Sequence, residues 1–180
     1  MILDKFVFAL QSSQAIQTLK IKEPVVAALD FGEDLLLVAL KAYLKVMQFQ
    51  FREGLYECVG FCKPKNISYN EKDHHFCVMA LDPFNERVLY GAKQNGVLLQ
   101  MNLQEPRSIR QAEYVLLQPR ARQNIRVLDL KCADSEHLLV LTEGCVQTFS
   151  KPLKQVVAEF GVPQSQLCLV LAPAVGLNFV

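Results

Sequence analysis

A 25-residue segment occurs twice in this chain without a gap, and this repeat constrains the fold more than any other feature. Residues 25–49 align with residues 77–101 at an offset of 52 positions. A weaker third copy covers residues 125–149 and keeps the pair Leu128-Asp129 before an apolar run. A repeat of this length is typical of architectures built from stacked supersecondary units. The identical pairs of the first two copies are Val26/Val78, Ala28/Ala80, Leu29/Leu81, Asp30/Asp82, Leu37/Leu89, Lys41/Lys93 and Gln48/Gln100.

Each copy contains three short apolar segments, and a fourth segment follows it. In the second copy we expect strands over residues 78–81, 87–92 and 97–103. The pair Asn95-Gly96 predicts a hairpin turn of type I′, because that turn needs two residues tolerant of positive φ. Continuous apolar character is typical of strands that are covered on both faces. Four antiparallel strands per unit are therefore predicted, and a helix within residues 34–51 is the alternative. The fourth segments are residues 56–62, 112–118 and 154–160.

These units resemble the blades of β-propellers in the broad WD40-like class, because they open with an aliphatic strand, Leu-Asp and a short polar turn. The resemblance implies an all-β fold, a partial or small β-propeller of four-stranded antiparallel blades, about four in number. It also implies a non-catalytic role in binding other proteins, as in the divergent propellers of scaffolding proteins. We expect a single domain over residues 1–180, with units at about 25–62, 77–118 and 125–160 and partial blades at 3–22 and 166–180.

An arc of about four blades leaves apolar strand edges near residues 3–10 and 167–180, unless the blades close a minimal ring. Exposed strand edges are normally paired, charged or covered. We therefore expect other protein subunits to cover the open blade edges, and self-association or missing downstream sequence are the alternatives. The main functional prediction is a protein–protein interaction scaffold subunit of a larger complex.

Arginines are concentrated between residues 107 and 131. Guanidinium groups pair well with carboxylates and phosphates, so this strip is a candidate partner-binding site for an acidic protein surface or RNA. A nucleic-acid-binding module that uses residues 107–131 is the alternative function, although Tyr114 is the one aromatic side chain nearby for base stacking. A solvated loop is the structural interpretation. The strip comprises Arg107, Arg110, Arg120, Arg122 and Arg126, with Lys131 at its end.

Cysteine and histidine, the usual zinc ligands, cluster between residues 58 and 77. The spacing is poor, because Cys58 and Cys62 lie four residues apart on a predicted strand, on one face but far from each other. We therefore expect buried cysteines and no metal or cofactor. Nucleophile-elbow and phosphate-loop motifs are also missing, so neither an enzyme nor a small-molecule substrate is predicted. The cluster consists of Cys58, Cys62, His74, His75 and Cys77.

The aspartates Asp30, Asp82 and Asp129 recur once in each copy. Equivalent positions in successive blades face the same side of a propeller, so a shared ligand site is one hypothesis. The favoured hypothesis is structural, because an aspartate at a strand end commonly accepts backbone N–H groups of the following turn.

Composition adds few constraints. The net charge of +1 carries no global signature of a nucleic-acid or membrane binder. The N-terminal segment does not fit a secretory signal, and no apolar run reaches the ~18 residues of a transmembrane helix. The six cysteines are therefore expected to be reduced, which predicts a cytoplasmic or nuclear protein.

Overall fold

The computed structural model describes residues 2–3, 6–11, 14–31, 34–41, 45–63, 76–93, 95–117 and 125–161, and for residues 2–16 it describes the backbone alone. Within these ranges all regular structure is β-strand. The described residues include no helix able to cross a membrane.

Three four-stranded antiparallel sheets form the body of the molecule, and each sheet pairs its strands in chain order. The predicted all-β fold is confirmed. The alternative helix is wrong, because residues 35–40 and 46–52 form the antiparallel strands β5 and β6. The first sheet contains β4 (Val25–Asp30), β5 (Leu35–Leu40), β6 (Val46–Arg52) and β7 (Leu55–Cys62); the second contains β8 (Phe76–Leu81), β9 (Val88–Lys93), β10 (Leu98–Glu105) and β11 (Ser108–Leu116); the third contains β12 (Val127–Cys132), β13 (His137–Thr142), β14 (Cys145–Ser150) and β15 (Gln155–Gly161).

A three-stranded antiparallel sheet precedes these three sheets. It consists of β1 (Ile2–Leu3), β2 (Phe6–Gln11) and β3 (Gln14–Lys20), paired in that order. β1 lies against β4 and β3 lies against β7, so one face of this N-terminal sheet covers the first four-stranded sheet.

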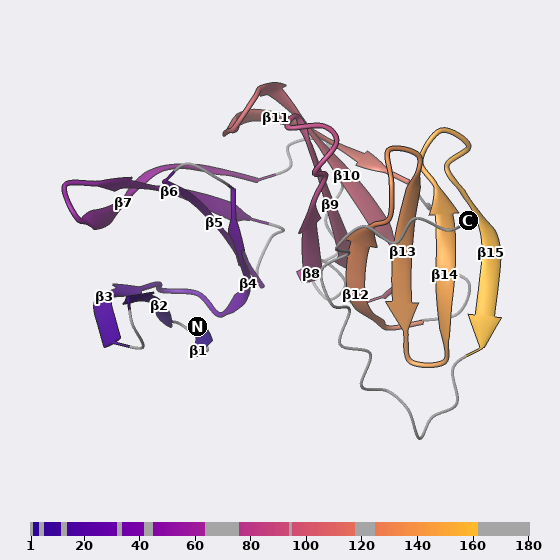
Figure 1. Ribbon diagram of the computed structural model, residues 1–180, viewed down its shortest axis with the longest axis horizontal. Coiled ribbons are helices and arrows are strands. Elements are labelled where there is room, and N and C mark those ends of the chain that lie inside the picture. Colours follow the sequence, from indigo (N-terminus) through magenta and orange to yellow (C-terminus); the bar gives the residue numbers. More distant parts are fainter. Residues whose placement is uncertain are drawn as a thin grey trace, which may run out of the picture.

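The four sheets follow one another as an arc (Figure 1). The first strands of the four-stranded sheets are neighbours, since β8 contacts both β4 and β12. The last strands, β7 and β11, also meet at the outer side of the arc. Each sheet therefore stacks face to face on the next, which is the arrangement of propeller blades.

Apolar side chains fill the space between neighbouring sheets. Leu37 of the first sheet and Leu89 of the second are fully buried in one shared cluster. Tyr90 of the second sheet packs with Leu138 and Phe149 of the third sheet in another cluster. Burying one such side chain contributes about 1.5–3 kcal/mol, so the seams between sheets are the main source of stability. The second sheet is apolar on both faces because it has a neighbour on each side.

The gapless alignment of the first two copies agrees with the strand pairing in the first two strands of their sheets, and in the third strand it is wrong by one residue. Leu37 faces Gln48 across β5 and β6, whereas Leu89 faces Met101 across β9 and β10. Gln48 therefore corresponds to Met101 in three dimensions, and the predicted equivalence of Gln48 and Gln100 is wrong. The cause is the hairpin between the two strands, which differs in length between the two sheets.

The hairpin at Asn95-Gly96 is present, but it is not the predicted two-residue turn. The Lys93 N–H donates to the Val97 carbonyl, and the Gly96 N–H donates to the Lys93 carbonyl, which encloses three residues. Gly96 has a φ of 85°, as a three-residue turn requires at its last position. A Cβ at Gly96 would collide with the carbonyl oxygen of Ile125, so this glycine also permits close contact between the second and third sheets.

Candidate protein-interaction surface

Among the described residues, the third sheet has one buried face and one open face. Leu138, Val140 and Phe149 point toward the second sheet and are almost completely buried. Side chains alternate between the faces of a strand, so Leu139 and Leu141 point the other way. Both are only half-buried. In the part of the chain that the structure describes, no further sheet packs on this side of β12–β15.

Cross-strand register extends this open face over the neighbouring strands. Leu141 pairs with Val146, and Val146 pairs in turn with Phe160, whose side chain is 62% exposed. Tyr90, which lies on the face of the second sheet that the third sheet covers, is 3% exposed. We define the free face by Leu139, Leu141, Val146 and Phe160. It is apolar like the face of the second sheet that contains Tyr90, but no described sheet covers it.

Two charged residues of β12 lie on the same side. Asp129 pairs with Leu141 and Lys131 pairs with Leu139, and directly opposed residues share a face of the sheet. The corresponding first strand of the second sheet carries Val78 and Ala80 on the side that faces its neighbour. The free face is thus apolar over β13, β14 and β15 and charged along β12.

The register also corrects the prediction that the three aspartates are equivalent. Asp82 directly follows β8 and Asp30 ends β4, but Asp129 lies inside β12. The Asp82 carboxylate accepts the Phe84 N–H at 3.0 Å, which confirms the predicted turn-capping role for this residue. In the third sheet Asp134 has that role, since its carboxylate accepts the N–H groups of Glu136 and His137. Because Asp129 lies inside its strand while Asp30 and Asp82 lie at strand ends, the three carboxylates do not form one common ligand site.

Asp82 has a second contact that joins the second and third sheets. The Lys151 ammonium donates to its carboxylate at 2.9 Å and to the Asp134 carbonyl at 2.9 Å. The side chains of this ion pair are only 9% and 4% exposed. Lys151 also lies 5.4 Å from the centre of the Tyr90 ring. Sequence reasoning missed this pair, because a lysine in a turn after a strand has no feature that distinguishes it from a solvated one.

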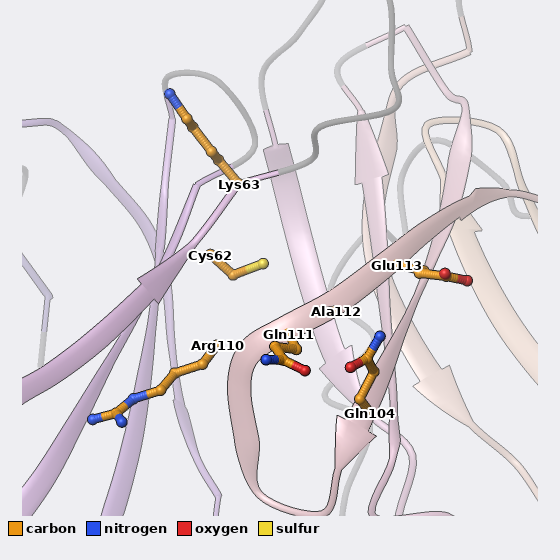
Figure 2. A pocket seen from close by; sticks show the side chains of 7 residues that line it. All are labelled: Cys62, Lys63, Gln104, Arg110, Gln111, Ala112 and Glu113. Atoms are coloured by element: carbon orange, nitrogen blue, oxygen red, sulfur yellow. The ribbon is translucent and has the colours of Figure 1, made fainter.

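A groove of about 550 Å³ opens where the first and second sheets meet, between β7 and β11. Figure 2 shows the Lys63 and Arg110 side chains extending in different directions from it. The Arg110 guanidinium donates to the Val59 carbonyl at 2.9 Å. Because Glu113 lines the same groove, its charges are of both signs. The lining residues are Cys62, Lys63, Gln104, Arg110, Gln111, Ala112 and Glu113.

The described arginines of the predicted strip have separate contacts. Arg107, in the turn between β10 and β11, lies 3.5 Å from the Glu86 carboxylate. Arg126 precedes β12 and lies 3.8 Å from the Glu143 carboxylate, with both side chains largely exposed. Arg107 and Arg110 thus share one hairpin, whereas Arg126 belongs to the third sheet. Arg120 and Arg122 lie outside the described residues.

The Arg107 hairpin is anchored to the first sheet through its backbone. The buried Gln48 side chain donates to the Arg107 carbonyl at 2.7 Å and accepts the Ile109 N–H at 3.3 Å. Arg107 has a φ of 58°, a conformation that the turn imposes on it. Gln48 is therefore a polar link between two blades, a role that the repeat alignment did not reveal.

The cysteines behave as buried apolar residues or isolated thiols in the described part of the chain. β7 has a bulge between its pairings of Gly60 with Gln48 and Cys58 with Phe49. This extra residue reverses the alternation, so Cys62 is buried against the second sheet and Cys58 is exposed, not on one face as predicted. No group of three potential metal ligands occurs among the described residues, and His74 and His75 lie outside them.

Burial also changes the chemistry of two thiols near the seam between the second and third sheets. Desolvation raises the pKa of Cys77 to about 11 and the pKa of Cys132 to about 11. A thiol must ionise to act as a nucleophile, so these two groups are poor candidates for covalent catalysis.

Solved structures share this arrangement of sheets. The chain matches the β-propeller domain of Myceliophteria thermophila Cps50 (Swd1) with a TM-score of 0.60 and 13% identity, over 88% of this chain and 49% of that chain. It matches the structure of U3-55K with a TM-score of 0.56 and 10% identity, over 79% of this chain and 41% of that chain. The chain thus spans less than half the length of either structure. No protein-family model matches the sequence, and no curated protein matches it.

Proposed function

With the fold of a partial β-propeller as the premise, we propose that this chain is a non-catalytic scaffold subunit that binds other protein chains through the free face of its third sheet. The observation that carries the proposal is the difference between the two faces of that sheet. One face is almost completely buried by the second sheet, whereas the other leaves Phe160 62% exposed beside three half-buried aliphatic side chains. An apolar surface of this kind, bordered by charged residues, is typical of a protein–protein contact.

The test is affinity purification of the tagged chain at native salt, with quantitative mass spectrometry of the proteins that accompany it. Leu139→Lys is expected to remove those proteins, because it places a charge in the middle of the free face. Leu153→Lys is the matched control, since Leu153 is 64% exposed in the turn before β15 and outside that face. Equal recovery with both variants would refute the proposal.

Nucleic-acid binding by the strip of residues 107–131 remains the alternative hypothesis. The contacts of Arg107, Arg110 and Arg126 count against this alternative, because each guanidinium already has a partner within the chain. Phosphate binding by several arginines produces an affinity that falls steeply with salt. Titration of RNA and DNA oligomers at low and moderate salt would separate the two hypotheses, and tight binding that disappears with salt would favour nucleic acid.

A further inference from the structure

The two ends of the arc are open in different ways. At one end lies the free face of the third sheet, with its apolar side chains on β13, β14 and β15. At the other end lies the N-terminal sheet, which covers the first four-stranded sheet with one face and directs its other face away from the molecule (Figure 1). The arc therefore begins and ends with a sheet that has a neighbour on one side among the described residues.

The seams inside the chain show what such a face accepts. Each seam is a face-to-face contact between two antiparallel sheets, and the first strand of one sheet lies beside the first strand of the next. The free face is the other side of a sheet that already forms such a seam. Leu138 and Val140 of β13 point into the existing seam, whereas Leu139 and Leu141 of the same strand point to the free face. A further antiparallel sheet is therefore the occupant that continues the existing interfaces.

The match to a solved structure indicates how large a closed arrangement of such sheets is. The match covers 49% of the chain of the Cps50 β-propeller domain, so two such arcs have about the length of that domain. Closed propellers contain about 4–8 blades, a range that includes two arcs of four sheets. A head-to-tail contact between two copies closes after a two-fold rotation and leaves no end exposed.

We propose that the free face of the third sheet binds the N-terminal sheet of a second copy of this chain, so that two copies close one ring. The inference rests on the proposed function and names the partner. Each dimer then contains two identical seams, and in each seam Leu139, Leu141, Val146 and Phe160 become buried against the second copy. Asp129 and Lys131 lie at the inner side of each seam and restrict which sheet can dock there.

The experiment is the measurement of mass in solution, by light scattering after size exclusion and by sedimentation equilibrium, over a range of concentrations. The wild-type chain is expected at twice its mass of 20.3 kDa. Leu141→Asp is expected to halve that mass, because a carboxylate cannot be buried at the centre of the seam without a partner. Thr148→Arg is a second variant with the same expected result. Thr148 is half-buried on the same face, opposite Leu139, and it is already a polar residue in the native chain.

Leu153→Asp is the matched control and is expected to remain a dimer, since its side chain lies in a turn outside the seam. Circular dichroism and urea unfolding establish that each variant is folded. A monomeric wild-type chain at all concentrations, or oligomers that grow without limit, would overturn the inference. So would a dimer that neither variant weakens. If the wild-type chain is monomeric but loses another protein on Leu139→Lys, the second copy is the wrong partner while the proposed function stands.

Discussion

At the scale of single residues, the ion pair between Lys151 and Asp82 is the most buried of those between described residues. Removing one partner of a buried pair leaves an uncompensated charge, which is far more costly than the loss of an exposed pair. Lys151 also has contacts with the Asp134 carbonyl and the Tyr90 ring, so several groups depend on one ammonium.

We predict that Lys151→Met lowers the free energy of unfolding by about 3–5 kcal/mol, because it leaves the Asp82 carboxylate buried between two sheets without its cation. Urea unfolding followed by circular dichroism measures the loss. Arg126→Met is the control and is expected to change stability by less than about 0.5 kcal/mol, because its pair with Glu143 is exposed. A loss as small as that of the control would show that the buried pair contributes little.

The buried thiols give a second prediction at this scale. With a pKa of about 11, Cys132 has a thiolate fraction of about one in a thousand at pH 8, much less than an ordinary cysteine. Alkylation by iodoacetamide, mapped by peptide mass spectrometry, is expected to be slow at Cys77 and Cys132 and fast at the exposed Cys58. Equal rates in the folded protein would contradict this assignment.

The same two groups make stability depend on alkaline pH. Their pKa is higher in the folded chain than in the unfolded chain, where it is near 9.0, so the folded state binds protons more tightly. Their contribution is complete below pH 9 and is lost as the pH rises toward 11. The free energy of unfolding, measured with a reductant present, is expected to fall in that window.

At the scale of elements, each blade is linked to the next by a few specific contacts in addition to apolar burial. Gln48 holds the β10–β11 hairpin of the second sheet through two hydrogen bonds from the first sheet. Gly96 allows the β9–β10 turn to approach the backbone at Ile125 before the third sheet. Both contacts lie at seams, where a change in one blade is transmitted to its neighbour.

Gln48→Ala is expected to cost about 1–3 kcal/mol, because it leaves a buried carbonyl and a buried N–H without their partner. Gln100→Ala is the control, since the Gln100 side chain bonds Asn102 within its own strand. We expect the control to change the urea midpoint much less. Similar losses at both positions would mean that the two glutamines are equivalent, as the gapless alignment predicts and the register contradicts.

At the scale of the whole molecule, we expect backbone amide hydrogens to be best protected from exchange where a sheet has a neighbour on both sides. β9 is buried at every residue between the first and third sheets, whereas β15 is the last strand of the third sheet and mostly exposed. Local opening is easiest where few apolar contacts must break.

Hydrogen exchange followed by mass spectrometry is therefore expected to be slowest in β9 and fastest, among the four-stranded sheets, in β15. The interior hydrogen bonds of β13 provide an internal comparison, since this strand has one covered and one free face. Exchange in β15 as slow as in β9 would contradict the view that the seams stabilise the molecule.

The sequence by itself determined the class of fold and the number of strands in each unit. This was possible because a strand covered on both faces needs a continuous apolar run, and short polar turns separate these runs. The capping role of Asp82 was also readable, since an aspartate after a strand satisfies the N–H groups of its own turn.

Only the tertiary structure decided which residues correspond between blades and which surface is left open. Because the hairpins differ in length, Gln48 is equivalent to Met101 and not to Gln100. The bulge in β7 places Cys58 and Cys62 on different faces of the sheet. Leu139 and Leu138 are the same residue type on the same strand, yet one is half-buried and the other fully buried. That difference arises because a neighbouring sheet covers one side of β13, and neighbours of this kind come from segments distant in the sequence.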